Sequence, residues 1–262
     1  MRERAGLIVL LVAIVGVLSQ LPVAQRLEQD VGLDWLFGLR GPVEAPPGAV
    51  VVAIDPDSIG WLQRHSGRLD RTAPELHACL GEDAAARLAT MRNASQVPRE
   101  LFACLVERLA GAGARLQIFD IHFALSMEGD ARLAEAMRDA GSVILLERIL
   151  SGPRPGGGAP VLIRRSPPQR LRRAALGTVA FKVENAPGGL TTRYLVRLEA
   201  FPDLPAMPVE AHRRTGGDPP EGGEARLFWL CGPPGTVPTV SLRGPLSDGR
   251  ARAAVELEGE VV

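Results

Sequence analysis

Apolar residues form one long uncharged run near the start of the chain. Residues 5–25 (AGLIVLLVAIVGVLSQLPVAQ) contain no ionisable side chain. As a helix rising about 1.5 Å per residue, the run would cross a hydrocarbon core of about 30 Å. Arg2 and Arg4 precede it, whereas Arg26 is the only basic residue close behind it. Because basic residues favour the inner side of a membrane, the pattern predicts an inner-membrane anchor at 1–25 with residues 26–262 outside.

A cleaved secretory signal is the alternative for this run. Such a signal has the same basic start, a shorter apolar stretch and a small-x-small cleavage site. The sequence Pro22-Val23-Ala24 matches that site poorly, so the uncleaved anchor is favoured. Leu27, Val31 and Trp35 continue a near-helical spacing, and we expect Trp35 to pack beneath the following domain rather than at the membrane interface.

Beyond the anchor, strand-like and helix-like patterns alternate. Apolar runs at 49–55, 115–120 and 142–149 predict strands, the first of them buried on both faces. Asp57-Ser58 is predicted to start a helix, and two more helices are predicted, one from Pro98 to 111–113 and one at 130–140. This order predicts an α/β fold with a mainly parallel sheet, flanking helices and right-handed crossovers.

Other segments are less regular. Residues 63–96 are predicted to be an irregular, partly helical insertion that contains a helix at 82–91. The second half is predicted to hold helices at 169–173 and 205–214, paired strands at 176–183 and 192–199, and a strand at 225–230. An apolar strand begins at Val261, near the last residue of the sequence. We therefore expect one large domain, 26–262, whose C-terminal strand is cut off.

Composition and charge exclude several classes of function. The chain has 30 basic and 30 acidic residues, with Lys182 as the only lysine, and its aromatic residues are 7 Phe, 3 Trp and 1 Tyr. No basic cluster with interleaved aromatic residues is present, so nucleic acid is not expected as a partner. The four histidines show no metal-ligand spacing, and neither a serine nucleophile elbow nor a phosphate-binding loop is found. We expect no metal and no cofactor.

Two of the three cysteines occur in similar contexts. Cys79 lies in ELHACL and Cys104 in ELFACL, so each occupies the same phase of an apolar helical face. In an oxidising compartment a Cys79–Cys104 disulfide is one expectation. Two buried free thiols that act as small hydrophobic side chains are the other.

Polar residues at the strand ends suggest a ligand site. Asp55 and Asp120 each end a predicted strand, at the carboxyl edge where open α/β sheets bind ligands. With Ser58 and Arg99 they form a candidate binding cluster in which Arg99 would keep both carboxylates ionised. The alternative is that strand-end aspartates only cap turns and helices.

An enzymatic hypothesis also begins at Asp55. The segment VVAIDPDSI, residues 51–59, resembles the first motif of haloacid-dehalogenase-type phosphohydrolases, in which the first Asp attacks phosphorus and the second acts as acid and base. Asp55 and Asp57 match these positions. That chemistry also needs a lysine and a later pair of acids for magnesium. Lys182 is followed by Gly217-Asp218 with no second aspartate nearby, so this hypothesis is the less favoured one.

The order of motifs resembles the second type of CHASE domain, an extracytoplasmic sensory module of bacterial receptors. The matching segments are the leader helix, LFGLRGP at 36–42, VVVAIDPDSI at 50–59, Pro98-Arg99 with LVERLAGAGARLQIFDIHF at 105–123, and CGPPGTVPTVS at 231–241. The resemblance spans residues 27–262, with the 63–96 segment as a variation.

This resemblance implies a sensory function without catalysis in this chain. It implies an unidentified small-molecule or envelope ligand, transmembrane helices after the strand at Val261, and a cytoplasmic cyclase or kinase output that this chain lacks. We expect a homodimer at the membrane. An exported phosphohydrolase using Asp55 and a structural envelope protein are the alternatives.

Overall fold

The computed structural model describes residues 35, 39–41, 48–91, 96–153, 161–185, 191–218, 225–227 and 237–247. The predicted anchor at 1–25, its boundary with the following domain and the strand expected at Val261 lie outside these residues. No helix in the described ranges combines the length and the apolar character that crossing a membrane requires.

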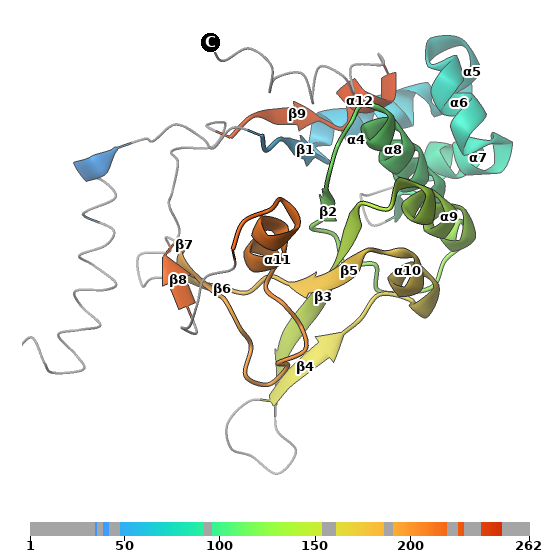
Figure 1. Cartoon of the computed structure of the whole chain (residues 1–262). Helices are drawn as coiled ribbons and strands as arrows, with labels where there is room; N and C mark the ends of the chain where they lie inside the picture. The colour runs from blue at the N-terminus through green and yellow to red at the C-terminus, as the bar shows by residue number, and fades with distance from the viewer. Residues whose placement is uncertain are drawn as a thin grey trace, which may run out of the picture.

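The centre of the fold is a small sheet built around one long strand, β3 (Val143–Gly152). Its first half pairs in parallel with β2 (Gln117–Phe119) and β5 (Gly177–Ala180), and its second half pairs antiparallel with β4 (Val161–Arg165). The helices that precede these parallel strands in the chain pack together along one side (Figure 1). They are α8 (Arg99–Gly111), α9 (Asp130–Ala140) and α10 (Gln169–Ala174).

Helices α8 and α9 form where the sequence predicts them. The buried faces of α8 and α9 contain Phe102, Leu105, Leu133 and Met137, each at most 6% exposed. A fully buried leucine or methionine contributes about 2 kcal/mol through apolar burial. Helix α9 is capped by the following residue, Gly141, whose φ of 62° is left-handed and favours glycine. Apolar periodicity and a helix-ending glycine therefore account for these two elements.

A second, two-stranded sheet carries the first described strand. Strand β1 (Val51–Ala53) pairs in parallel with β9 (Thr239–Ser241), close to the last described residues. The expectation that this strand is buried on both faces is wrong, because Val51 is 48% exposed. Helix α4 (Pro56–His65) follows β1, and α12 (Arg243–Ser247) follows β9 and contacts both α4 and α8.

The 63–96 segment is more helical than expected. After the end of α4 it contains four helical pieces, which lie beside α8 and α9 (Figure 1). They are η2 (Ser66–Arg68), α5 (Leu69–Thr72), α6 (Pro74–Leu80) and α7 (Glu82–Thr90). Leu76 and Leu88 are fully buried in the main core. This insertion is therefore part of the packed domain.

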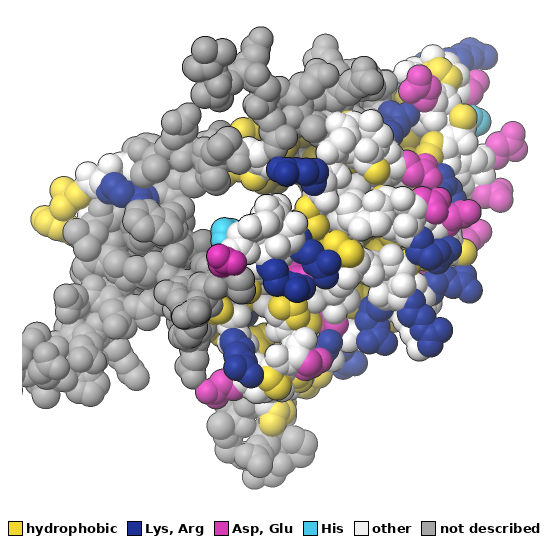
Figure 2. Space-filling view, viewed as in Figure 1, with side chains coloured by type: hydrophobic (Ala, Val, Ile, Leu, Met, Phe, Trp, Pro, Cys, Tyr) yellow, Lys and Arg dark blue, Asp and Glu magenta, His cyan; other side chains and the backbone are white. Residues whose placement is uncertain are grey.

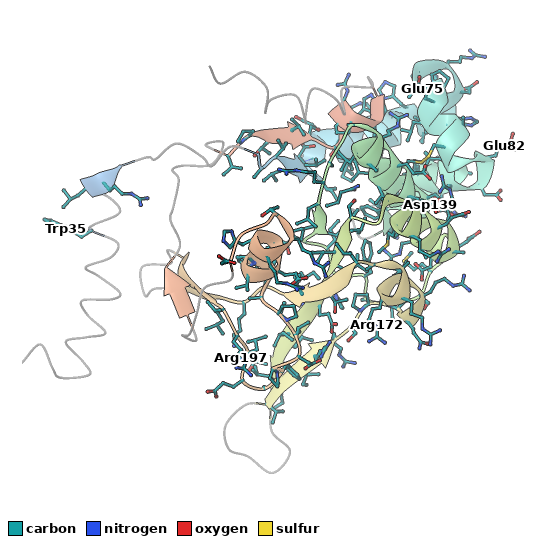
Figure 3. All side chains as sticks on the ribbon, viewed as in Figure 1. Trp35, Glu75, Glu82, Asp139, Arg172 and Arg197 are labelled. Carbon is teal, nitrogen blue, oxygen red and sulfur yellow. A yellow bond between two sulfur atoms is a disulfide. The ribbon has the colours of Figure 1, made fainter. Side chains whose placement is uncertain are left out.

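The remaining elements make the fold mixed rather than mainly parallel. Strands β6 (Val183–Asn185), β7 (Thr191–Leu195) and β8 (Ala225–Leu227) form an antiparallel sheet, and α11 (Met207–Arg214) lies between it and β5. The α/β class is confirmed, but small mixed sheets replace one mainly parallel sheet. The expected packing of Trp35 also differs, because its side chain is 72% exposed and points away from the domain (Figure 3).

Candidate functional site

Asp55 follows β1 directly and caps helix α4. Its Oδ1 atom accepts the Ser58 N–H at 2.7 Å and the Ser241 hydroxyl of β9 at 3.1 Å. The hydroxyl of the fully buried Ser58 donates to the Asp55 carbonyl at 2.9 Å. Hydrogen bonds from Ser58, and then from Ser241, outweigh the effect of burial and lower the pKa of the Asp55 carboxyl. Asp55 is therefore the N-cap, in place of the expected Asp57-Ser58 pair.

The surroundings of Asp55 do not resemble a phosphohydrolase site. Asp57 is exposed in the first turn of α4. In the described part of the chain, no lysine and no second acid contacts the Asp55 carboxylate. The same ranges hold no group of three His, Cys, Asp or Glu side chains that could bind a metal ion. The cap joins β1, α4 and β9, which is a structural role.

Arg99 begins α8 and pairs with Asp130, which begins α9. The Nε–Oδ1 distance is 2.9 Å, and both side chains are 7% exposed. The Arg99 Nη2 also donates to the Leu125 carbonyl at 3.2 Å, and the guanidinium lies 4.3 Å from the centre of the Phe123 ring. Arg99 thus fixes the loop between β2 and α9. Its contacts include neither of the two aspartates expected beside it.

Asp120 is the exposed member of the predicted cluster. It follows β2, and no hydrogen bond or ion pair joins it to another described residue. Asp120 and Ile54, which precedes Asp55, line the same cavity of about 770 Å³ between β1 and β2. The ends of the two strands therefore border one cavity, as the sequence suggests. Ligand binding by Asp55, Ser58, Arg99 and Asp120 stays a prediction.

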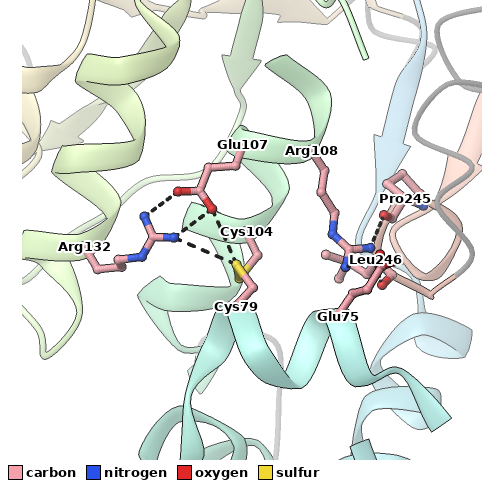
Figure 4. Close-up of a disulfide and its surroundings, with 8 residues drawn as sticks. All are labelled: Glu75, Cys79, Cys104, Glu107, Arg108, Arg132, Pro245 and Leu246. Carbon is pink, nitrogen blue, oxygen red and sulfur yellow. Dashed lines mark hydrogen bonds and ion pairs between the residues drawn. A yellow bond between two sulfur atoms is a disulfide. The ribbon is translucent and has the colours of Figure 1, made fainter. Parts of the chain in front are cut away.

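A disulfide joins Cys79 of α6 to Cys104 of α8 (Figure 4). The Cα atoms are 6.0 Å apart, and Cys104 is fully buried. Beside the bond, Arg132 of α9 donates to Glu107 of α8 at 2.7 Å, and its Nη2 lies 4.0 Å from the Cys79 sulfur. Of the two alternatives for the cysteines, the structure contains the disulfide. The bond attaches the 63–96 insertion covalently to the central helix.

A buried ionic cluster around Glu147 is absent from the sequence predictions. Glu147 of β3 is 1% exposed and accepts hydrogen bonds from Arg164 of β4 at 2.8 Å and Ser166 at 2.6 Å. Arg164 also donates to Asp203 at 2.7 Å. Burial alone raises the pKa of Glu147, but hydrogen bonds from Arg164, Ser166 and Thr178 outweigh it and lower the pKa to about 2. The signal available in the sequence is an acid inside the apolar run VILLERIL.

The comparisons with known proteins identify the family. The CHASE2 domain model matches residues 8–249, which is most of the chain. No curated protein and no solved structure matches. CHASE2 domains are extracytoplasmic sensory domains of signalling proteins and are typically non-catalytic. The family match covers an α/β fold in which a strand-end aspartate caps a helix. The chain therefore belongs to the CHASE2 domain family.

Proposed function

We propose that this chain is the input part of a membrane-anchored bacterial receptor. Residues 1–25 anchor it in the inner membrane, and residues 26–262 lie outside, where they detect an envelope stimulus. The Cys79–Cys104 disulfide carries this proposal, because structural disulfides persist in oxidising compartments and are rare in the cytosol. The family assignment and the placement of Arg2 and Arg4 before the apolar run support the same orientation.

The signalling mechanism requires two arrangements of the domain. A ligand or envelope condition shifts their populations only as far as it binds one arrangement better than the other. We propose a homodimer in which the anchor helices pass this difference to a cytoplasmic output of the cyclase or kinase type. The cavity bordered by the exposed Asp120 is the favoured place for a stimulus to act, since Asp55 and Arg99 are engaged in internal contacts.

Topology gives the direct test of this proposal. Alkaline phosphatase, which is active only in an oxidising compartment, is fused after Gly41, and β-galactosidase is fused at the same position as the complementary reporter. We expect high phosphatase and low galactosidase activity. The double variant Arg2→Glu, Arg4→Glu is the matched control and should lower phosphatase activity, because it removes the basic bias. High galactosidase activity of the unmodified fusion would contradict the proposal.

A further inference from the structure

Arginine side chains without acidic partners gather on α10 and at the end of β4. The segment RRSPPQRLRR, residues 164–173, contains five arginines and no acid. Arg164 is ion-paired with Glu147 and Asp203. The other four are exposed, and none of them forms an ion pair with another described residue: Arg165, Arg170, Arg172 and Arg173. Figure 2 shows dark-blue side chains gathered over α10, whereas acidic side chains gather over α9 and α7.

Arg148 of β3 adds a fifth unpaired cation. It lies directly opposite Arg165 in the register of β3 and β4, and it too is exposed, with no acidic partner in the described ranges. Like charges directly opposite each other on neighbouring strands are destabilising. The β4–α10 basic surface is the name used below for these five side chains: Arg148, Arg165, Arg170, Arg172 and Arg173.

Stability of the fold explains only part of this charge. Arg172 and Arg173 lie in the last turn of α10, where the helix dipole favours cations. Arg170 lies in the first turn, which contains no acid, although the dipole favours negative charge there. Arg170 and Arg173 are also three positions apart, so two like charges are neighbours on the helix surface. Arg148, Arg165 and Arg170 therefore stabilise nothing in the described part of the domain.

The side chains of this surface fit the phosphate groups of phospholipids. The planar guanidinium of arginine donates two parallel hydrogen bonds to a phosphate. Exposed aliphatic side chains lie beside the cations: Val161 and Ile163 of β4 are each 38% exposed, and Leu176, which follows α10, is 37% exposed. Residues 161–176 contain no aromatic side chain on which a nucleic-acid base could stack. Basic and aliphatic side chains together are typical of a surface that contacts an anionic membrane.

We propose that the β4–α10 basic surface docks on anionic phospholipid headgroups of the membrane in which the chain is anchored. The inference rests on the proposed function for its tether, since the anchor keeps the headgroups at a high effective concentration and weak contacts are then sufficient. This is the reason for preferring a membrane to an acidic protein as the partner. Docking neutralises the opposed Arg148 and Arg165 and determines which side of the domain faces the membrane.

Headgroup quenching in lipid nanodiscs tests the inference on the full chain. In a Cys231→Ser background, Gln169→Cys places a fluorescent label on α10, and nitroxide-labelled headgroups quench it on contact. We expect strong quenching in discs that contain phosphatidylglycerol, weak quenching in discs of phosphatidylcholine alone, and loss of the difference in about 1 M salt, where the screening length falls to about 3 Å. Equal quenching in both kinds of disc would overturn the inference.

The double variant Arg165→Gln, Arg170→Gln separates docking from folding. It should lower the ratio of docked to undocked chain about tenfold or more. Its Tm should not fall, because the substitutions relieve the repulsion with Arg148 and remove a cation from the first turn of α10. Arg64→Gln with Arg68→Gln is the matched control, since it removes two exposed arginines without ion pairs in the described ranges from another part of the domain. An equal loss of quenching in this control would refute the assignment to the β4–α10 basic surface.

A charge-conserving variant covers the case in which the glutamine variant does not fold. Arg165→Lys with Arg170→Lys should still be quenched more strongly in anionic discs than in neutral ones, and the difference should again disappear in high salt. A difference that survives high salt would overturn the inference. Copurification of the chain with neutral discs reports the anchor, whereas the difference between neutral and anionic discs reports docking. Failure of the proposed function and failure of this inference are therefore distinguishable.

Discussion

Glu147→Gln is the substitution whose effect follows most directly from the structure. The carboxylate is buried and accepts hydrogen bonds from Arg164 and Ser166. Its pKa is lowered from 4.5 to about 2, and at 1.36 kcal/mol for each pKa unit this corresponds to about 3 kcal/mol. Removal of one partner of a buried ion pair costs a similar amount, about 3–5 kcal/mol. We expect the variant to lose about 3 kcal/mol of stability at pH 7.

The same contact predicts how stability depends on pH. Because folding lowers the pKa of Glu147, its contribution is fully present above pH 4.5 and is lost as the pH falls from 4.5 toward 2. Urea titrations of the domain at several pH values measure this directly. The difference between wild type and Glu147→Gln should shrink across that window and be nearly constant above it.

Asp203→Asn provides the matched control for this prediction. Asp203 binds the same Arg164, but its side chain is 68% exposed, so solvent screens this ion pair and its substitution should lower stability much less than Glu147→Gln does. The double variant Glu147→Leu, Arg164→Met should be more stable than Glu147→Gln, since it leaves no unpaired buried charge. If Glu147→Gln and Asp203→Asn lower stability equally, the assignment of a dominant buried pair is incorrect.

Three further substitutions test other contacts. Cys79→Ser together with Cys104→Ser should cost about 3 kcal/mol, because a cross-link spanning 25 residues is lost; an unchanged denaturation midpoint would argue against the bond. Asp55→Ala should cost about 1 kcal/mol in the same titration, whereas Asp55→Asn should keep most of the cap, and equal losses would contradict capping. Asp120→Asn should leave the Tm unchanged, because Asp120 is exposed and contacts no partner among the described residues. It should reduce signalling by the full-length receptor if the carboxylate binds the stimulus; a lowered Tm would reveal a structural role.

Local patterns were sufficient for elements with clear periodicity and clear ends. Helices α8 and α9 were predicted almost residue for residue, because their apolar faces repeat at the helical period and glycines end both. Strand β4 was not predicted, because its sequence does not separate apolar from polar residues onto two faces. Val161 and Ile163 are apolar but both 38% exposed, and the charged Arg164 lies beside them in the strand. Its position depends on pairing with the far half of β3, which no local pattern encodes.

The candidate site shows the same limit. The sequence correctly located polar residues at two strand ends, but their partners come from distant segments. Asp55 contacts Ser241, 186 positions later, and Arg99 contacts Asp130, 31 positions later. Side-chain pairing of this kind is decided by tertiary packing, so the predicted Asp55–Arg99–Asp120 cluster separated into a cap, a buried ion pair and one exposed carboxylate.

The disulfide determines how material for ligand screening has to be produced. Protein expressed in a reducing cytosol would have α6 attached to α8 only through non-covalent contacts, and the 63–96 insertion could separate from the central helix at a lower free-energy cost. Such a preparation samples conformations that exported protein does not. Candidate stimuli should therefore be screened against protein secreted through an oxidising pathway, with thiol quantification as the quality criterion for each batch.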